Sequence, residues 1–148
     1  MAKEQMTTQP ALQLKRTFQA PRDRVFRAWT DPKELALWFR ASPDYSTRVP
    51  VLDFRVGGKY CLELRHKDGN VHRLAGTYRE IKPPEKIVFT WRWEQDPNAY
   101  DSLVTVEFRD LGQSTEIALH HEQFPNVEEC EKHNQGWNGC FDQFVKYL

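Results

Sequence analysis

The last stretch of the chain, residues 126–148, has the hydrophobic periodicity of one long amphipathic helix. Asn126 and Glu129 follow Pro125 in the arrangement of a capping box, which is typical of a helix start. The apolar positions recur at helical spacing and form one stripe: Val127, Cys130, Trp137, Phe141, Phe144, Val145 and Leu148. Another part of the chain must cover this stripe, because a helix within a protein is stabilised mainly by the packing of its apolar face.

Shorter elements are predicted near the N-terminus. Residues 12–18 alternate between apolar and polar positions and predict a first strand. Pro21 suits the first turn of a short helix. Asp31, Pro32 and Glu34 then indicate the start of a second short helix, as its N-cap, N1 and N3 residues.

From residue 48 onward the hydrophobic period changes to two, which predicts six further strands with one apolar face and one polar face. Turn signals separate them at Gly57-Gly58, Asp68-Gly69, Pro83-Pro84 and Gly112. Ile81 is out of phase with its own strand, so we expect a β-bulge near Arg79 or Glu80.

The order of elements predicts an α+β fold in which one curved antiparallel sheet wraps around the long C-terminal helix. Residues 1–10 are polar and lack periodicity, and are predicted to be a flexible tail before a single domain over residues 11–148. Gly136 and Gly139 fall on the polar side of the terminal helix. We expect each to cost about 1 kcal/mol relative to alanine without opening space toward the sheet.

The composition of the chain limits the classes of partner that we expect it to bind. The chain of 148 residues carries 21 basic and 21 acidic residues, and this zero net charge provides no field that would attract nucleic acid. No apolar run is long enough for membrane insertion, and the first residues lack a secretory apolar segment. We therefore expect a soluble, cytoplasmic protein. The three cysteines are an odd number without a C-x-x-C pair, which favours reduced thiols.

Several motifs carry a family resemblance. Residues 53–58 have the pattern D-x-R-x-G-G, residues 68–69 supply a hairpin, and residues 76–84 read G-x-Y-x-E-I-x-P-P. Further landmarks lie outside this region, at Ala20-Pro21, Asp31-Pro32, Gly136-Trp137 and Tyr147-Leu148. With these motifs, residues 11–148 resemble the family of activator of heat-shock-protein-90 ATPase homologues, in the START-like (Bet v 1-like) superfamily.

The resemblance implies the helix-grip fold, in which a cavity often opens between the sheet and the C-terminal helix. Known relatives include carriers of hydrophobic ligands, polyketide cyclases and aromatases, and the domain that stimulates the chaperone's ATPase, so the fold alone does not select a function. The resemblance covers only one of the two domains of the eukaryotic activator, which weighs against a direct co-chaperone role.

Aromatic and aliphatic side chains on the predicted inner faces are suited to the wall of a ligand cavity. The same side chains could equally fill one another's space as a solid core. The candidate lining residues are Trp38, Phe39, Tyr60, Leu62, Leu74, Tyr78, Phe89, Trp91, Val104, Val106, Ile117, Leu119, Trp137, Phe141 and Phe144.

Two polar residues share these faces. Arg16 is in phase with Leu14 and Phe18, so it either anchors an acidic ligand, pairs with an internal carboxylate or reaches solvent at a strand edge. His121 is in phase with Leu119 near the end of the last strand. It either orients a ligand or transfers a proton, or it only bonds a loop carbonyl.

Motifs for other chemistry are missing from the sequence. Cys130 and His133 lie one helical turn apart, but two ligands are too few for a structural metal, and no phosphate-binding or nucleophile motif is present. We expect no metal and no cofactor. The leading hypothesis is a non-enzymatic protein that binds a small hydrophobic or amphipathic molecule. One alternative is a cyclase or aromatase in which Arg16, Tyr60, Tyr78 or His121 assists proton transfer, and another is a chaperone-interacting module that stimulates an ATPase.

Overall fold

Seven strands form one antiparallel sheet in the computed structural model, which describes residues 9–148. They are β1 (Leu12–Phe18), β2 (Tyr45–Leu52), β3 (Lys59–His66), β4 (Val71–Lys82), β5 (Lys86–Trp93), β6 (Ser102–Asp110) and β7 (Thr115–Glu122). The order across the sheet is β1-β7-β6-β5-β4-β3-β2, so β1 and β2 are its edges.

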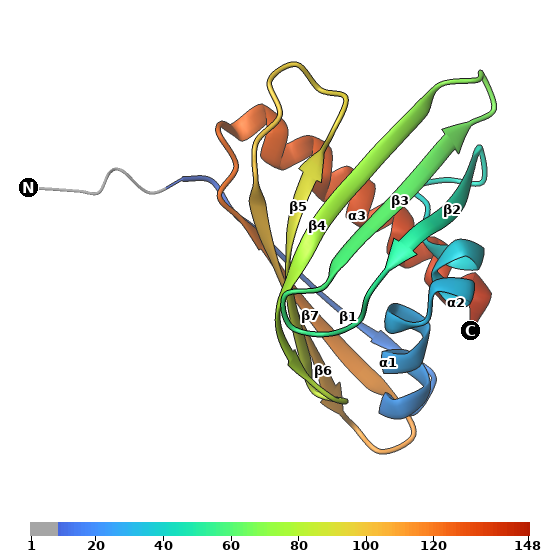
Figure 1. Cartoon of the computed structure of the whole chain (residues 1–148). Helices are drawn as coiled ribbons and strands as arrows, with labels where there is room; N and C mark the ends of the chain where they lie inside the picture. The colour runs from blue at the N-terminus through green and yellow to red at the C-terminus, as the bar shows by residue number, and fades with distance from the viewer. Residues whose placement is uncertain (1–8) are drawn as a thin grey trace, which may run out of the picture.

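Three helices accompany the sheet: α1 (Arg22–Thr30), α2 (Pro32–Trp38) and α3 (Val127–Tyr147). The sheet curves around α3, while α1 and α2 lie near the end of the sheet where α3 ends (Figure 1). This architecture confirms the predicted α+β helix-grip fold. None of the helices within residues 9–148 is long and apolar enough to cross a membrane.

The structure confirms two local features predicted from the sequence, a β-bulge and a helix cap. The β4–β5 pairing shifts register between Tyr78 and Glu80, where the bulge was expected. The Asp31 carboxylate accepts a hydrogen bond from the Lys33 backbone N–H at the start of α2. Most of the predicted tail, residues 1–8, lies outside the described residues, so the division into a tail and a single domain stays a prediction.

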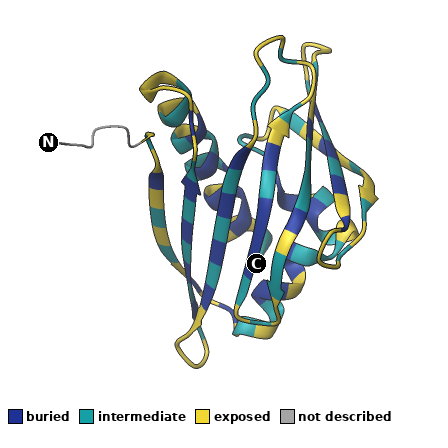
Figure 2. Ribbon diagram, turned by 60° about the vertical axis from the view of Figure 1, so that its left-hand side comes forward, coloured by how far each residue is buried: buried dark blue, intermediate teal, exposed yellow. Residues whose placement is uncertain are grey.

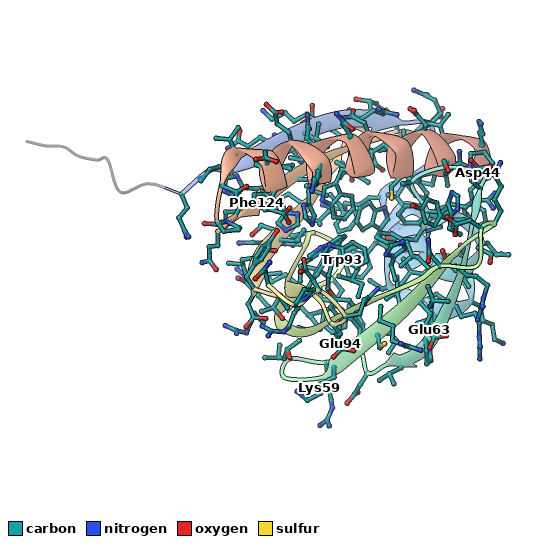
Figure 3. All side chains as sticks on the ribbon, turned by 90° about the horizontal axis from the view of Figure 1, so that it is seen from above. Asp44, Lys59, Glu63, Trp93, Glu94 and Phe124 are labelled. Atoms are coloured by element: carbon teal, nitrogen blue, oxygen red, sulfur yellow. The ribbon has the colours of Figure 1, made fainter. Side chains whose placement is uncertain are left out.

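Buried residues recur along the strands and along α3 (Figure 2). Seen along the layers, side chains fill much of the space between α3 and the sheet (Figure 3). Trp137, Phe141 and Phe144 of α3 are buried, as expected. Aromatic contacts are dense here: Phe18 meets Phe144 with ring centroids 4.9 Å apart.

Two members of the predicted helix stripe are exposed instead. Val127 is 61% exposed and Val145 is 52% exposed. Both lie about 80° around the helix from Trp137, at 100° per residue, on the side away from the sheet. His133 and Cys140, on the other side of Trp137, are buried in their place. The covered sector of α3 is therefore rotated relative to the stripe predicted from hydrophobicity.

This rotation also corrects the expectation for the two helix glycines. A Cβ atom at Gly139 would collide with the backbone carbonyl oxygen of Ala41, in the segment between α2 and β2. A Cβ atom at Gly136 would meet no other atom within 4 Å, and Gly136 lies on the wall of a cavity. Gly139 thus permits close approach of the chain, and Gly136 leaves open space.

A network around one carboxylate joins the three helices. Glu34 of α2 accepts hydrogen bonds from Arg24 Nη1 at 2.6 Å, from Tyr147 Oη at 2.7 Å and from Arg27 Nε at 3.0 Å. Burial raises the pKa of Glu34, but these hydrogen bonds outweigh burial and hold the pKa below its usual value. Glu34 was predicted as a helix-start residue, and the structure adds this role in fixing the C-terminal end of α3.

The two glycines provide a matched test of helix packing. Alanine at either position gains up to about 1 kcal/mol of helix propensity. We expect Gly136→Ala to raise the free energy of unfolding by up to that amount, because its methyl group enters open space. Gly139→Ala should lower it, because the methyl group displaces the Ala41 backbone. Urea unfolding of both variants checks this, and equal effects at the two positions would contradict the packing described for Gly139.

Candidate functional site

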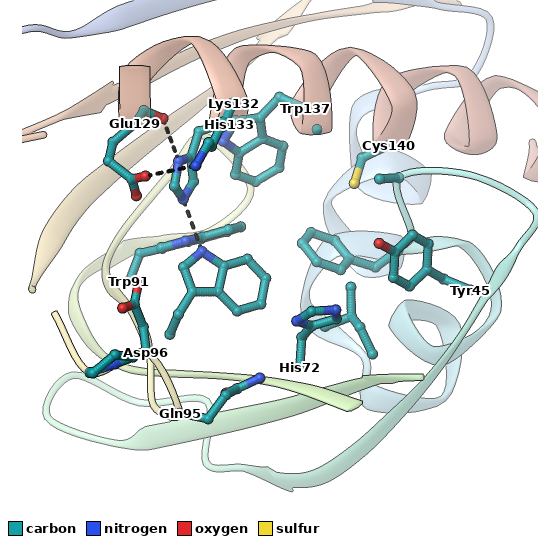
Figure 4. A pocket seen from close by; sticks show the side chains of 16 residues that line it. Tyr45, His72, Trp91, Gln95, Asp96, Glu129, Lys132, His133, Trp137 and Cys140 are labelled. Atoms are coloured by element: carbon teal, nitrogen blue, oxygen red, sulfur yellow. Dashed lines mark hydrogen bonds and ion pairs between the residues drawn. The ribbon is translucent and has the colours of Figure 1, made fainter. Parts of the chain in front are cut away.

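A cavity of about 560 Å³ opens between α3 and the sheet, at the end of the molecule where α3 begins (Figure 4). Sixteen residues line it, and most of the surface they present is apolar. The aromatic walls are Phe39 after α2, Tyr45 on β2, Trp91 and Trp93 on β5, and Trp137 on α3. The space between sheet and helix is therefore part solid core and part cavity.

The aromatic walls are formed by residues of one strand, β5, and one helix, α3. Trp91 and Trp93 are two residues apart on β5, so both face the helix. Their rings are nearly perpendicular, with centroids 5.6 Å apart. Trp137 approaches from α3, with its ring centroid 5.1 Å from that of Trp91. The edge-to-face contact between Trp91 and Trp93 is a favourable arrangement for a pair of aromatic rings.

A hydrogen-bond chain behind this wall ties α3 to the sheet. Trp137 Nε1 donates to His121 Nδ1 at 3.0 Å. His121 Nε2 therefore carries the proton and donates to Ser102 Oγ at 2.7 Å, and Ser102 Oγ donates to the carbonyl oxygen of Trp91 at 3.3 Å. Burial lowers the pKa of His121 to about 2. His121 is thus a neutral structural acceptor in this structure.

A second indole–histidine pair forms part of the cavity wall itself. Trp93 Nε1 donates to His133 Nε2 at 2.9 Å, and His133 Nδ1 donates to the Glu129 carbonyl oxygen at 2.7 Å (Figure 4). Burial lowers the pKa of His133, despite the raising effect of its bond to Glu129. Burial also raises the pKa of Cys140, on the same wall, to about 12. The inner part of the cavity therefore carries no charge at neutral pH.

Charged residues lie toward one side of the cavity. The Glu129 carboxylate accepts from Tyr100 Oη at 2.8 Å and from Lys132 Nζ at 3.4 Å. Burial, and then the hydrogen bond to Glu129, raises the pKa of Tyr100.

Gln95 connects the segment after β5 to β4. Its side-chain oxygen accepts a hydrogen bond from the Arg73 backbone N–H, and its side-chain nitrogen donates to the Val71 carbonyl oxygen, each at 2.9 Å. These bonds hold the β5–β6 segment against β4.

A much smaller inner cavity of about 30 Å³ lies deeper between the sheet and the first two helices. Tyr60, Tyr78 and Phe89 from the sheet and Trp29 from α1 are among its walls. Phe39 and Trp91 line both cavities, and they form the partition between the two. Tyr60 Oη donates to the Thr90 carbonyl oxygen at 2.6 Å, which fixes its ring in place.

The structure divides the sequence-predicted site residues into three groups. Phe39, Trp91 and Trp137 line the main cavity. The inner cavity has Tyr60, Leu62, Leu74, Tyr78 and Phe89 on its walls, in addition to Phe39 and Trp91. The solid core takes up Trp38, Val104, Val106, Ile117, Leu119, His121, Phe141 and Phe144.

Arg16 lies apart from both cavities. Its guanidinium pairs with the Asp142 carboxylate at 2.8 Å and stands over the Phe141 ring, 5.4 Å from the centroid. Arg16 is therefore on the helix side of edge strand β1, as its phase predicts, and its partner is an acidic residue of α3. Arg16, Tyr60, Tyr78 and His121 do not converge on one point, although the Tyr60 and Tyr78 rings lie 5.7 Å apart.

Sequence reasoning missed part of the main cavity. Tyr45, His72, Trp93, His133 and Cys140 all line it, and none was among the candidates. Two signals were available in the sequence. His133 lies four residues before Trp137 and so on the same side of the helix. Trp93 lies two residues after Trp91 and so shares its strand face. The β5–β6 segment gave no signal, because segments without periodicity do not indicate where they fold.

Within residues 9–148, no three histidine, cysteine or acidic side chains gather as metal ligands would. The three cysteines are free thiols in the structure.

The fold and the cavity define a START-like helix-grip protein. The chain belongs to the family described as activator of Hsp90 ATPase homolog 1-like protein, whose model matches residues 19–148. This result confirms the resemblance found in the sequence.

Individual relatives agree with the family. The chain is 29% identical over 133 residues to the human activator of 90 kDa heat shock protein ATPase homolog 1, a match that covers 90% of this chain and 35% of the human protein. A Schizosaccharomyces pombe protein is 30% identical over 113 residues, covering 76% of this chain and 30% of that protein. The chain thus spans about a third of the length of these relatives.

Solved structures give the same fold over nearly the whole chain. A Chromobacterium violaceum protein is similar with a TM-score of 0.85 and 29% identity, covering 92% of this chain and 94% of that one. A Rhizobium loti protein has a TM-score of 0.76 and 28% identity, covering 94% and 96%.

The buried state of His121 predicts a specific pH dependence. Its pKa is about 2 in the folded protein, against about 6.5 when unfolded, so the unfolded state binds more protons below pH 6.5. The stability from the neutral imidazole is complete above that pH and is lost as pH falls. Between pH 7 and pH 5 the loss attributable to His121 is about 2 kcal/mol.

His121→Gln should remove this part of the pH dependence, since glutamine keeps an acceptor and a donor without titrating. Urea unfolding at both pH values measures it. His120→Gln is the control, because His120 is the neighbouring residue and points outward, so that variant should behave as the wild type. The same loss in His121→Gln as in the wild type would show that His121 is not held neutral.

Proposed function

We propose that this protein binds a small, mainly aromatic or alicyclic molecule in the main cavity between α3 and β5. The observation that carries the proposal is the aromatic wall of a cavity of about 560 Å³, whose indole and imidazole groups already bond one another. Ligand sites are typically concave, largely apolar and formed in advance, with volumes of about 300–1,000 Å³.

The lack of charge in the inner part of the cavity favours a neutral ligand. His133 and Cys140, which line the inner part of the cavity, are uncharged at neutral pH because burial opposes their ionisation. An ionised group placed beside them would lose hydration without a charged partner, because the charged lining residues Asp96, Glu129 and Lys132 lie toward one side. The composition that predicts a soluble, cytoplasmic protein fits a carrier of such a molecule, and that localisation is part of the proposal.

Blocking the cavity tests this proposal. Gly136→Leu places a side chain into open space at the cavity wall, whereas Gln135→Leu places the same side chain on the exposed face of α3. A library of neutral aromatic compounds should include ligands that raise the unfolding temperature of the wild type. A ligand at 100 times its dissociation constant adds about 2.7 kcal/mol of stability. Gly136→Leu should lose this gain and Gln135→Leu should keep it.

Native mass spectrometry of freshly purified protein provides a second measurement of the same point. The absence of any library hit, together with no co-purified mass, would contradict ligand binding. Equal shifts in both leucine variants would contradict the location of the site.

A second candidate function comes from the human relative, whose name describes an activator of a heat-shock-protein ATPase. The similarity, 29% identity over 90% of this chain, makes a related action on a 90 kDa chaperone the second candidate function. If so, adding the chain in excess should raise the steady-state ATP hydrolysis rate of such a chaperone. Gly136→Leu should stimulate as well as the wild type, because a surface contact does not need the cavity. An unchanged hydrolysis rate would contradict this function.

A further inference from the structure

Two polar side chains, Tyr45 and His72, line the main cavity from the first residues of two strands. Tyr45 begins β2 and lies two residues before Thr47, which is buried. His72 is the second residue of β4 and lies two residues before Leu74, which is also buried. Residues two apart on a strand share a face, so both polar side chains lie on the face that is turned toward α3.

Packing against other rings sets the positions of both side chains. The Tyr45 ring meets His66, its partner across β2 and β3, edge to face with centroids 4.8 Å apart. His66 Nδ1 in turn accepts a hydrogen bond from the Asp68 backbone N–H at 3.2 Å. The His72 ring lies 6.2 Å from the Tyr45 ring and 6.3 Å from the Trp93 ring, centroid to centroid. Tyr45 and His72 are therefore neighbours at one end of the aromatic wall.

This end of the cavity differs from its charged side and from its inner wall. Tyr45 and His72 lie away from Asp96 and Glu129, across the cavity (Figure 4). Tyr45 is half-buried and His72 is exposed, so water reaches both side chains in the free protein. On the inner wall, by contrast, His133 uses both ring nitrogens in hydrogen bonds within the protein.

A ligand that fills this end of the cavity must replace the water on Tyr45 and His72. Affinity is lost when a ligand displaces such water and cannot form hydrogen bonds in its place. A tyrosine hydroxyl both donates and accepts, and a neutral imidazole ring has one donor and one acceptor. A hydroxyl group on the ligand fits this pair in either tautomer of His72, because it also donates and accepts.

From this arrangement we infer that the ligand is a neutral ring compound with a hydroxyl group, a phenol or an alicyclic alcohol. The hydroxyl group lies between Tyr45 and His72, and the ring system lies against Trp93. This inference rests on the proposed ligand-binding function and adds the polar group, its position and its two partners.

A matched pair of probes isolates the hydroxyl group. 2-Naphthol and 2-methylnaphthalene have the same two-ring skeleton, and hydroxyl and methyl groups are similar in size. A purely apolar cavity would prefer 2-methylnaphthalene, because the hydroxyl group gives up more hydration. We expect the wild type to bind 2-naphthol about tenfold more tightly than 2-methylnaphthalene in isothermal titration calorimetry, as two modest net hydrogen bonds imply.

Substitutions at the two partners should lower this ratio of affinities. Tyr45→Phe removes only the hydroxyl group and keeps the ring against His66, and His72→Phe keeps a ring without its nitrogens. Each should lower the ratio about threefold, and the double variant should bring it to about one or below. Tyr100→Phe is the matched control: it removes a tyrosine hydroxyl group beside Glu129, from a residue that does not line the cavity, and should keep the ratio.

Nuclear Overhauser effects locate the probe directly. With 2-naphthol bound to the wild type, the probe protons beside the hydroxyl group should show contacts with the ring protons of Tyr45 and His72. These ring signals are assigned as the ones missing from Tyr45→Phe and His72→Phe. Should either variant fail to fold, backbone-to-side-chain correlations in the wild type assign them, and contacts found only with other residues then overturn the inference.

The outcomes separate this inference from the proposal beneath it. Equal binding of the two probes by the wild type, a preference for 2-methylnaphthalene, or a preference for 2-naphthol that survives in the double variant overturns the roles of Tyr45 and His72 while ligand binding stands. Binding of neither probe also overturns the inference. The proposed function falls with it only if the wider library yields no hit.

Discussion

The hydrogen bond from Trp137 Nε1 to His121 Nδ1 sets the position of α3 on the sheet. A helix that buries an indole must find an acceptor for its N–H, or pay about 1–3 kcal/mol for leaving it unpartnered. His121 of β7 provides that acceptor, and only in its neutral form. One bond therefore fixes three properties together: the rotation of α3, the tautomer of His121, and the orientation of the ring that closes the back of the main cavity.

The same solution recurs at the cavity wall, where His133 accepts from Trp93. In the first pair the indole comes from the helix and the imidazole from the sheet, and in the second pair these roles are exchanged. Two such bonds across the layers hold large flat side chains in place where aliphatic side chains would close the gap. Close approach of the α2–β2 segment to α3 at Gly139 completes the enclosure, since Ala41 and Phe39 both lie on that segment and both line the cavity.

The sequence predicted the elements better than the cavity. Alternation along β5 and the capping residues Asp31 and Asn126 depend on near neighbours in the chain, so they could be found from the sequence alone. The cavity depends on the rotation of α3, which is set by hydrogen bonds between residues far apart in sequence. Hydrophobicity counted Val127 toward the buried stripe and left out His133, because a histidine paired to an indole is buried for a reason that hydrophobic periodicity does not record.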